Sequence, residues 1–209
     1  NGLSMELAAL TEPLSVAEHC IGNRTNITAE DQVIVSGPGI IGLLCAVSAR
    51  SRGAEVVIAG TEKDETARLS TARTLGFQTI TVGQNLTPLS EQIETIFPNG
   101  ADALIEASGA PIALAEAWRS VRPDGTVTAV ALYAKTIDFD LTQFVRKQID
   151  LRTSYASSKP DYLRAFNLLL DGKVDGEALL SIYNLEDAEK AFIDSESLKV
   201  MKAVLACQG

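Results

Sequence analysis

The glycine-rich run from Gly37 to Gly42 has the residue types and the spacing that hold a dinucleotide phosphate. It fits the pattern G-x-G-x-x-G directly after a β-branched run. In this pattern Gly37 permits a sharp turn, Gly39 lets the backbone approach a pyrophosphate, and Gly42 lets a helix pack closely on the strand. The start of that helix offers free N–H groups to the phosphates. The candidate cofactor contacts are Gly37, Pro38, Gly39, Ile40, Ile41 and Gly42, although a tight turn without a ligand has the same composition.

The end of the second expected strand decides between NAD and NADP. An acidic residue there accepts hydrogen bonds from the ribose hydroxyls, whereas a small or cationic environment admits a 2′-phosphate. Glycine occupies the expected acidic position, so NADP is slightly favoured, and Gly60→Asp is expected to shift the preference towards NAD. NAD stays open, because Glu62 or Asp64 could accept from the ribose. The candidate residues of this pocket are Gly60, Thr61, Lys63 and Arg68.

Two further runs follow expected strands at their carboxyl ends, which is where open α/β sheets bind ligands. The first run begins after Glu106 and the second ends at Leu132. A plain loop is an equally good interpretation of Leu132 and Tyr133. The candidate cofactor contacts here are Ala107, Ser108, Gly109, Val130, Ala131 and Leu132.

Alternating strand and helix patterns surround these runs. Short apolar runs indicate strands over 32–36, 55–59, 78–82, 103–106, 126–132 and 150–155. Helical patterns cover 40–52, 64–75, 89–97, 112–121 and 141–148, and a turn is expected at 123–125. Crossovers of this length imply parallel pairing with right-handed connections. The sequence therefore predicts an α/β fold with a doubly wound parallel sheet, the Rossmann fold.

The two ends of the chain have a different pattern. Residues 1–27 are helical without a strand, and we expect them to form a linker helix from a catalytic domain. Residues 28–155 form the predicted dinucleotide-binding domain. Residues 156–209 contain helical patterns over 162–170 and 185–193 and an apolar strand over 199–205. We expect this last segment to return towards the catalytic domain.

Composition excludes several classes of protein. The chain has 18 Lys and Arg against 27 Asp and Glu, a formal charge of −9, which disfavours nucleic acid as a partner. No apolar run approaches the roughly 20 residues of a membrane-spanning helix, so a membrane is not expected either. The three cysteines are widely spaced and form no metal-binding pair. We expect a cytoplasmic protein.

Several runs resemble the medium-chain, zinc-dependent alcohol dehydrogenases, in the branch of the sorbitol and threonine dehydrogenases. The run from Ala8 to Ala17, with its Glu-Pro-Leu-Ser core, is similar to the segment that precedes the cofactor domain of that family, and it is the most discriminating part. The glycine run, Arg68-Leu69, Leu75-Gly76, Glu106 to Gly109 and Arg122 to Val127 follow the family's order and approximate spacing. The resemblance covers essentially the whole chain.

The resemblance implies a function and a set of partners. The family transfers hydride between NAD or NADP and an alcohol or polyol, with zinc as the Lewis acid. Glu12 matches the acidic residue that approaches the catalytic zinc or its bound water, so it is the candidate catalytic residue and a possible metal ligand. The strand near Leu151 to Tyr155 resembles the edge through which cofactor domains pair into homo-oligomers. Gly60 and Tyr133 depart from the family, which usually has aspartate and often glycine there.

The zinc site itself is the largest departure. A catalytic zinc needs about three protein ligands and an open position. The family's catalytic half supplies a cysteine and a histidine that have no counterpart here, and His19 and Cys20 are too close in sequence to share a metal well. We therefore expect a fragment that is inactive alone, with zinc only in the full-length enzyme. The alternatives are a standalone dinucleotide-sensing module without catalysis and, less favoured, a Rossmann-like methyltransferase.

Overall fold

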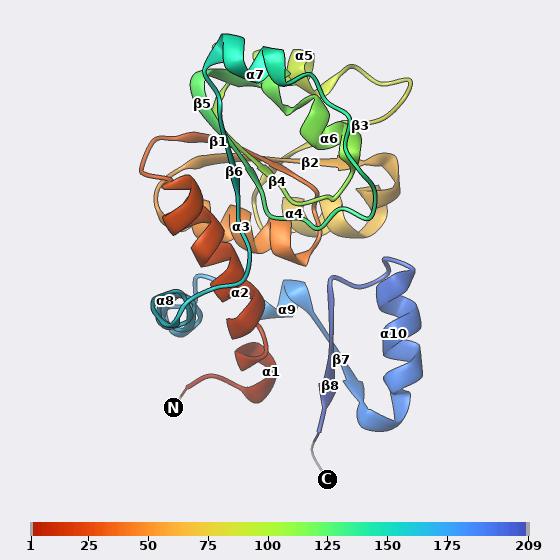
Figure 1. Ribbon diagram of the computed structural model, residues 1–209. Helices are drawn as coiled ribbons and strands as arrows, with labels where there is room; N and C mark the ends of the chain where they lie inside the picture. Colours follow the sequence, from red (N-terminus) through yellow and green to blue (C-terminus); the bar gives the residue numbers. More distant parts are fainter. Residues whose placement is uncertain (1, 208–209) are drawn as a thin grey trace.

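A parallel sheet of six strands forms the centre of the computed structural model, which describes residues 2–207 (Figure 1). The strands lie in the order β3-β2-β1-β4-β5-β6, and every neighbouring pair is parallel. Two halves thus diverge from β1 and β4, which is the doubly wound Rossmann arrangement. The predicted fold class is confirmed. The strands are β1 (Gln32–Ser36), β2 (Glu55–Thr61), β3 (Gln78–Val82), β4 (Ala101–Glu106), β5 (Val121–Ala129) and β6 (Asp150–Thr153).

Both faces of this sheet are covered at its centre, which explains why β1, β2 and β4 are mostly buried along their length. In β1, Val33 and Val35 enter one core while Ile34 enters the other, because side chains alternate along a strand. The first core is closed by α3 (Ile40–Ser51) and α4 (Ser70–Thr74). The second core is closed by α5 (Leu89–Glu94), α6 (Pro111–Ala115) and α7 (Leu141–Lys147).

Several predicted elements have other ends than expected, such as the strand over 126–132, which stops at Ala129, and three further elements differ more. The helix expected over 64–75 is divided into a 3₁₀ turn at Glu62–Asp64, a π-helical segment at Glu65–Leu69, and α4. The helix expected over 112–121 ends early: α6 stops at Ala115, and a 3₁₀ turn (Ala117–Arg119) leads into β5. The turn expected at 123–125 lies inside β5 as a bulge, since the pairing with β4 shifts register there. Asp124 has a φ of 57°, which keeps this segment tightly bent.

The N-terminal segment packs beneath the sheet. It forms α1 (Met5–Ala8), α2 (Thr11–Glu18) and a π-helical segment (His19–Thr25). The α2 helix lies between α3 and α8 (Lys159–Leu170), and its Leu14 and Ala17 are fully buried in the first core. The N-terminal helices are therefore part of the folded unit around α3 (Figure 1).

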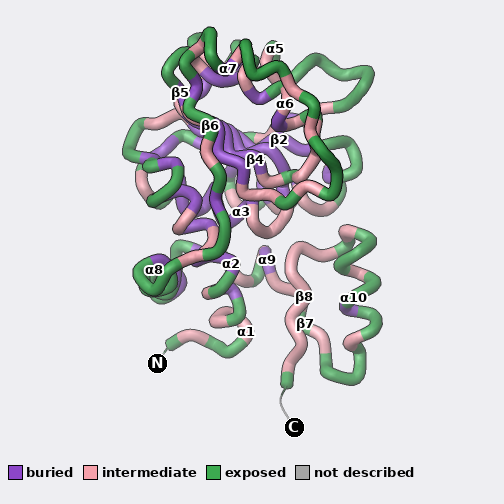
Figure 2. The backbone as a smooth tube through the Cα atoms, viewed as in Figure 1, coloured by how far each residue is buried: buried purple, intermediate pink, exposed green. Residues whose placement is uncertain are grey.

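The C-terminal segment forms a second sheet that the sequence only half predicted. It contains α9 (Gly176–Leu179), β7 (Leu180–Asn184), a 3₁₀ turn (Leu185–Asp187), α10 (Ala188–Glu196) and β8 (Lys202–Ala206). The β7 strand, which the sequence reading missed, pairs in parallel with β8. Figure 2 shows that little of this unit is buried. The predicted segments 1–27 and 156–209 also include Asn1, Gln208 and Gly209, which lie outside the described residues.

No helix within residues 2–207 combines the length and the apolar character that crossing a membrane requires.

Candidate dinucleotide-binding site

Packing requires glycine at both ends of the glycine-rich run. Gly37 follows β1, has a φ of 107°, and donates its N–H to the carbonyl of Ala59 at 2.8 Å. A Cβ at Gly37 would lie 2.6 Å from the backbone nitrogen of Ser108. A Cβ at Gly42 would overlap the carbonyl oxygen of Gly37. The turn from β1 into α3 can therefore close only because these two positions lack side chains.

The middle glycine faces open space instead. Gly39 caps the N-terminus of α3 in an extended conformation (φ −68°, ψ 175°) and contributes no side chain to the cap. A Cβ at Gly39 would meet only the Arg68 side chain, at 4.0 Å. The first-turn N–H groups of Ile40, Ile41 and Gly42 are the ones that a helix cannot satisfy internally. An uncovered helix N-terminus of this kind fits a pyrophosphate.

The structure corrects the sequence argument about Gly60. The β2 strand continues to Thr61, so Gly60 lies inside the strand, paired with Thr81. A Cβ at Gly60 would come within 2.8 Å of Cγ of Pro38 and 3.0 Å of Cδ2 of Leu69. The space in which a Gly60 side chain would begin is therefore occupied by Pro38 and Leu69. Glycine is needed here because the glycine-rich turn and the segment after β2 pack against this position.

The residues after Gly60 form a compact cap. The carboxylate of Asp64 accepts hydrogen bonds from the backbone N–H of Thr61 at 2.9 Å and from its hydroxyl at 2.7 Å. Asp64 is buried, whereas Glu62 and Lys63 are exposed. Of the two carboxylates that could accept from a ribose, that of Asp64 is thus already bound within its own turn, whereas that of Glu62 is exposed.

Arg68 is the cation that the structure brings to the glycine-rich turn. Its Nη1 lies 3.5 Å from Oδ1 of Asp64, and its guanidinium is the group nearest to the open side of Gly39. Nε of Arg68 is buried and has no hydrogen-bond partner. A buried donor without a partner costs free energy, so Arg68 has hydrogen-bonding capacity that the described residues leave unused.

The loops after β4 and β5 meet at the same edge of the sheet. The carbonyl of Glu106 accepts the backbone N–H groups of Val130 at 2.9 Å and Ala131 at 3.2 Å. A Cβ at Gly109 would lie 3.0 Å from the carbonyl oxygen of Leu132. The structure thus brings together Ala107, Ser108, Gly109, Val130, Ala131 and Leu132, with the Leu132 side chain 80% exposed.

Glu106 and Tyr133 hold these two loops together, and neither was among the candidate site residues from the sequence. The fully buried carboxylate of Glu106 accepts hydrogen bonds from both the backbone N–H (2.8 Å) and the hydroxyl of Ser108, and from the Tyr133 hydroxyl. Burial, followed by the Glu106 charge, raises the pKa of Tyr133. The feature of the sequence that could have indicated this role was an acidic residue at the end of an apolar strand.

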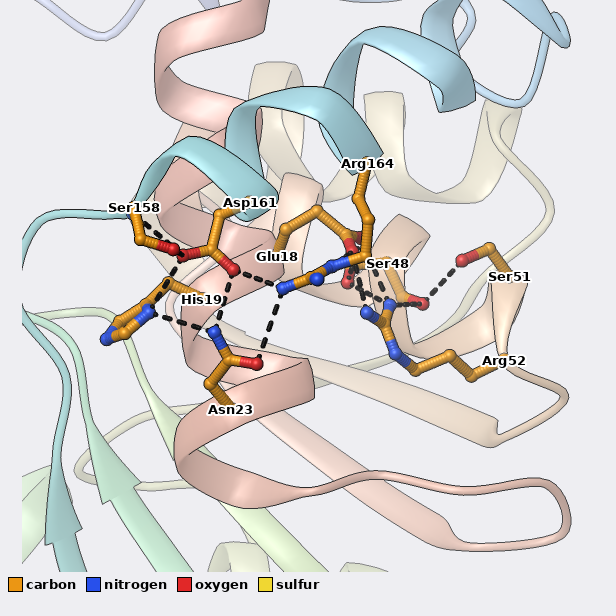
Figure 3. Close-up of polar contacts among 9 residues, drawn as sticks. All are labelled: Glu18, His19, Asn23, Ser48, Ser51, Arg52, Ser158, Asp161 and Arg164. Carbon is orange, nitrogen blue, oxygen red and sulfur yellow. Dashed lines mark hydrogen bonds and ion pairs between the residues drawn. The ribbon is translucent and has the colours of Figure 1, made fainter.

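The residues with metal-binding side chains are dispersed. Glu12 is exposed on α2. Nδ1 of His19 lies 3.0 Å from Oδ2 of Asp161 on α8 (Figure 3). Cys20 and Cys45 are buried. Within the described part of the chain no three His, Cys, Asp or Glu side chains are grouped as metal ligands. These residues do not fit a zinc site by themselves.

His19 belongs instead to a polar cluster that joins α2, α3 and α8, defined by Glu18, His19, Asn23, Ser48, Ser51, Arg52, Ser158, Asp161 and Arg164 (Figure 3). Arg52 reaches from the end of α3 to Glu18, with Nη2 2.6 Å from Oε2. Asp161 accepts from Ser158 and from Asn23, at 2.8 Å. The cluster stabilises the contact between the Rossmann sheet's helix α3 and the flanking helices.

Comparison with known sequences agrees with this geometry. Residues 41–171, more than half of the chain, match the family described as zinc-binding dehydrogenase. The chain is 32% identical over 206 residues to a sorbitol dehydrogenase from Halalkalibacterium halodurans, covering 98% of this chain and 60% of that protein. It is 31% identical over 209 residues to D-xylulose reductase A from Aspergillus oryzae, covering 98% of this chain and 58% of that protein. The chain thus spans about 60% of the length of the curated relatives that it matches.

Solved structures share the fold. The 2R,3R-butanediol dehydrogenase from Bacillus subtilis superposes with a TM-score of 0.88 at 22% identity, covering 100% of this chain and 59% of that one. A zinc-binding dehydrogenase from Sinorhizobium meliloti 1021, solved bound to NADP, superposes with a TM-score of 0.81 at 21% identity, covering 94% of this chain and 58% of that one. The sequence match and the shared fold lead to one conclusion. The chain belongs to the zinc-binding dehydrogenase family.

Proposed function

We propose that this chain is the NAD(P)-binding portion of a zinc-dependent dehydrogenase that transfers hydride between a nicotinamide dinucleotide and a polyol or similar secondary alcohol. The observation that carries the proposal is the open glycine turn between β1 and α3, flanked by the unpaired Nε of Arg68. A turn that only joined a strand to a helix would need neither the open side of Gly39 nor a cation with a free donor beside it. Both features suit a pyrophosphate.

The residues divide between the two halves of the dinucleotide. The first-turn N–H groups of α3 would hold the pyrophosphate, and Arg68 would face the adenosine half near the end of β2. The loops after β4 and β5, which contain Ser108 and Leu132, would hold the nicotinamide half. The bound nicotinamide would supply the hydride acceptor, since such chemistry belongs to the cofactor, while the protein orients the ring and excludes water.

NADP remains the favoured cofactor, for a reason that differs from the missing acid at Gly60. Arg68 carries a buried nitrogen without a partner, and Asp64, which could have received a ribose hydroxyl, is bound by Thr61. A cation with an unused donor suits a 2′-phosphate better than a neutral hydroxyl. The Sinorhizobium meliloti relative bound to NADP shows that the fold accepts this cofactor in another protein.

The proposals for the substrate and the metal depend on the similarity to the relatives. Those relatives are named for sorbitol and D-xylulose, so we propose a polyol substrate. We propose that residues 28–155 form the cofactor domain, and that residues 1–27 and 156–209 belong with a catalytic domain that supplies the remaining zinc ligands. Glu12 would then approach that zinc or its bound water. Two copies would pair through β6, an edge strand on which Leu151 is exposed.

Titration calorimetry of the 209-residue chain with NADPH, NADH and ATP tests the central part of the proposal. We expect saturable binding of a nicotinamide dinucleotide, tighter for NADPH than for NADH, because only NADPH carries a 2′-phosphate that Arg68 could hold. ATP controls for binding of any phosphate. A folded chain that binds neither dinucleotide, or that binds ATP equally well, would show that the glycine turn has no cofactor role.

A further inference from the structure

Glu106 is a buried acid for which hydride transfer requires no role. It lies at the carboxyl end of β4 and is fully buried. Its Oε1 accepts the backbone N–H of Ser108 at 2.8 Å together with the Ser108 hydroxyl. Its Oε2 accepts the backbone N–H of Gly109 at 3.3 Å together with the Tyr133 hydroxyl. Both oxygens are therefore saturated by donors, as a buried carboxylate requires.

Three of these four donors are local, and one is not. Ser108 and Gly109 follow Glu106 directly in the chain, so their hydrogen bonds shape the turn after β4. Tyr133 comes from the loop after β5, the neighbouring strand. Burial and the Glu106 carboxylate raise the pKa of Tyr133, so its hydroxyl stays protonated and remains a donor near neutral pH. The Tyr133 hydroxyl is thus the side-chain link between the two loops.

The place of the Tyr133–Glu106 hydrogen bond in the sheet indicates which half of the dinucleotide it could affect. In a doubly wound sheet each half holds one mononucleotide, and β4 and β5 belong to the half opposite β2 and β3. The link fixes Leu132, whose carbonyl faces Gly109 and whose side chain is 80% exposed at the open edge. Arg68 lies on the other half of the sheet, in the segment after β2.

We propose that Tyr133 is a positioning residue for the nicotinamide half of the dinucleotide, acting through its hydrogen bond to Glu106. This inference rests on the proposed cofactor function. The bond holds the loop after β5 against the loop after β4 before the ligand arrives. Affinity for the nicotinamide half then does not include the cost of ordering that loop, which is the general benefit of a preorganised site.

Two pairs of ligands separate this role from general stabilisation. NADPH is compared with ADP-ribose 2′-phosphate, and NADH with ADP-ribose. Within each pair the adenosine half is the same and only one member carries a nicotinamide ring, so any preference for NADP or NAD cancels. For Tyr133→Phe, loss of one hydrogen bond to a charged group is expected to weaken the nicotinamide-bearing ligand about tenfold. Affinity for its partner is expected to stay unchanged.

The matched control is Tyr183→Phe. The Tyr183 hydroxyl also donates to a carboxylate, that of Asp194 at 3.0 Å, but Tyr183 lies on the second sheet. Loss of this hydrogen bond should therefore leave the affinity for all four ligands unchanged. The emission of bound NADPH provides a second readout, because it comes from the nicotinamide ring and should approach the emission of the free ligand in Tyr133→Phe. Glu106→Gln, which keeps an acceptor oxygen for Tyr133, should show the same selective loss to a smaller extent.

The outcomes are distinct. A selective loss for the nicotinamide-bearing ligands supports the positioning role. An equal loss for both members of each pair would make Tyr133 a general stabilising residue, and unchanged affinities would make the link irrelevant to binding; either result overturns the inference. If the wild-type chain binds none of the four ligands, the proposed cofactor function is wrong, and the inference about Tyr133 fails with it. Should Tyr133→Phe not fold, Glu106→Gln decides by the same criterion.

Discussion

The guanidinium of Arg68 lies beside the open face of Gly39, where a Cβ would be 4.0 Å from Nη1. Arg68 comes from the π-helical segment after β2, and Gly39 caps the helix after β1. A positive charge and a helix N-terminus therefore converge on one opening, and both attract phosphate.

Gly39→Val should abolish dinucleotide binding and leave the fold intact. The Gly39 backbone has an extended conformation that valine accepts, and no backbone atom lies near its missing Cβ. The new side chain would occupy the path of the pyrophosphate. Titration calorimetry with NADPH and thermal unfolding measure the two effects.

Gly42→Ala is the matched control for that variant. Its Cβ would overlap the carbonyl oxygen of Gly37, so it should lower the free energy of unfolding by about 2 kcal/mol or more. Equal affinity of wild type and Gly39→Val for NADPH would mean that the phosphate binds elsewhere.

Arg68→Gln should reduce affinity for NADPH about 10- to 100-fold, the range expected for losing a hydrogen bond to a charged group, and change affinity for NADH much less. Glutamine keeps a polar side chain but removes the charge that faces the 2′-phosphate. Arg73→Gln is the control, because Arg73 is bound to Glu65 at 2.8 Å, away from the glycine turn. Tighter binding of NADH than of NADPH by the wild-type chain would sink the NADP preference outright.

Gly60→Asp should destabilise the protein rather than convert it to NAD. The new Cβ would lie 2.8 Å from Cγ of Pro38 and 3.0 Å from Cδ2 of Leu69, so these neighbours would have to move. A loss of about 1–3 kcal/mol in the free energy of unfolding is expected from overpacking. Urea denaturation measures it, with Gly172→Asp as a control at a position without neighbours within 4 Å but with a φ of 64°. A stable Gly60→Asp variant that prefers NADH would restore the original interpretation.

Asp161 should make stability depend on acidic pH. Burial alone would raise its pKa, but hydrogen bonds from Ser158 and His19 and the charge of Arg164 hold the pKa below its usual value. A carboxyl with a depressed folded-state pKa contributes stability above its unfolded pKa of about 4, and this contribution is lost as the pH falls through the folded value. The free energy of unfolding of the wild type should therefore fall below about pH 4.

Asp161→Asn should lack that contribution and be about 2 kcal/mol less stable at neutral pH, as expected for losing hydrogen bonds to a buried charged group. Asp138→Asn, in an exposed loop, is the control and should follow the wild-type pH profile. Parallel pH profiles for wild type and Asp161→Asn would show that the cluster around Asp161 does not couple protonation to folding.

The 209-residue chain should hold no stoichiometric zinc and should not oxidise sorbitol with NAD or NADP. Glu12 is a single exposed carboxylate, His19 is bound to Asp161, and a catalytic zinc takes about three protein ligands. Plasma emission analysis and an absorbance assay for reduced nicotinamide measure both quantities. One zinc per chain together with turnover would contradict the ligand count. In a longer protein that contains the catalytic domain, Glu12→Ala should weaken zinc retention or turnover more than cofactor binding.

The sequence by itself determined the Rossmann sheet and its glycine turn. The strands β1 and β3 were predicted with their observed ends, because each is a short run rich in β-branched residues. The spacing of Gly37, Gly39 and Gly42 likewise has a local physical cause, the tight turn from strand to helix. Features that depend only on residues close together in the chain can therefore be predicted from the sequence.

Only the tertiary structure decided which residues meet across the site. Gly60 was read as an open pocket, but neighbours from two other segments, Pro38 and Leu69, occupy that space. The bond between Glu106 and Tyr133 joins loops after different strands, and β7 acquires its strand conformation by pairing with β8. Such contacts depend on the order of the strands and on how closely the elements approach, and no spacing along the chain encodes a distance across a sheet.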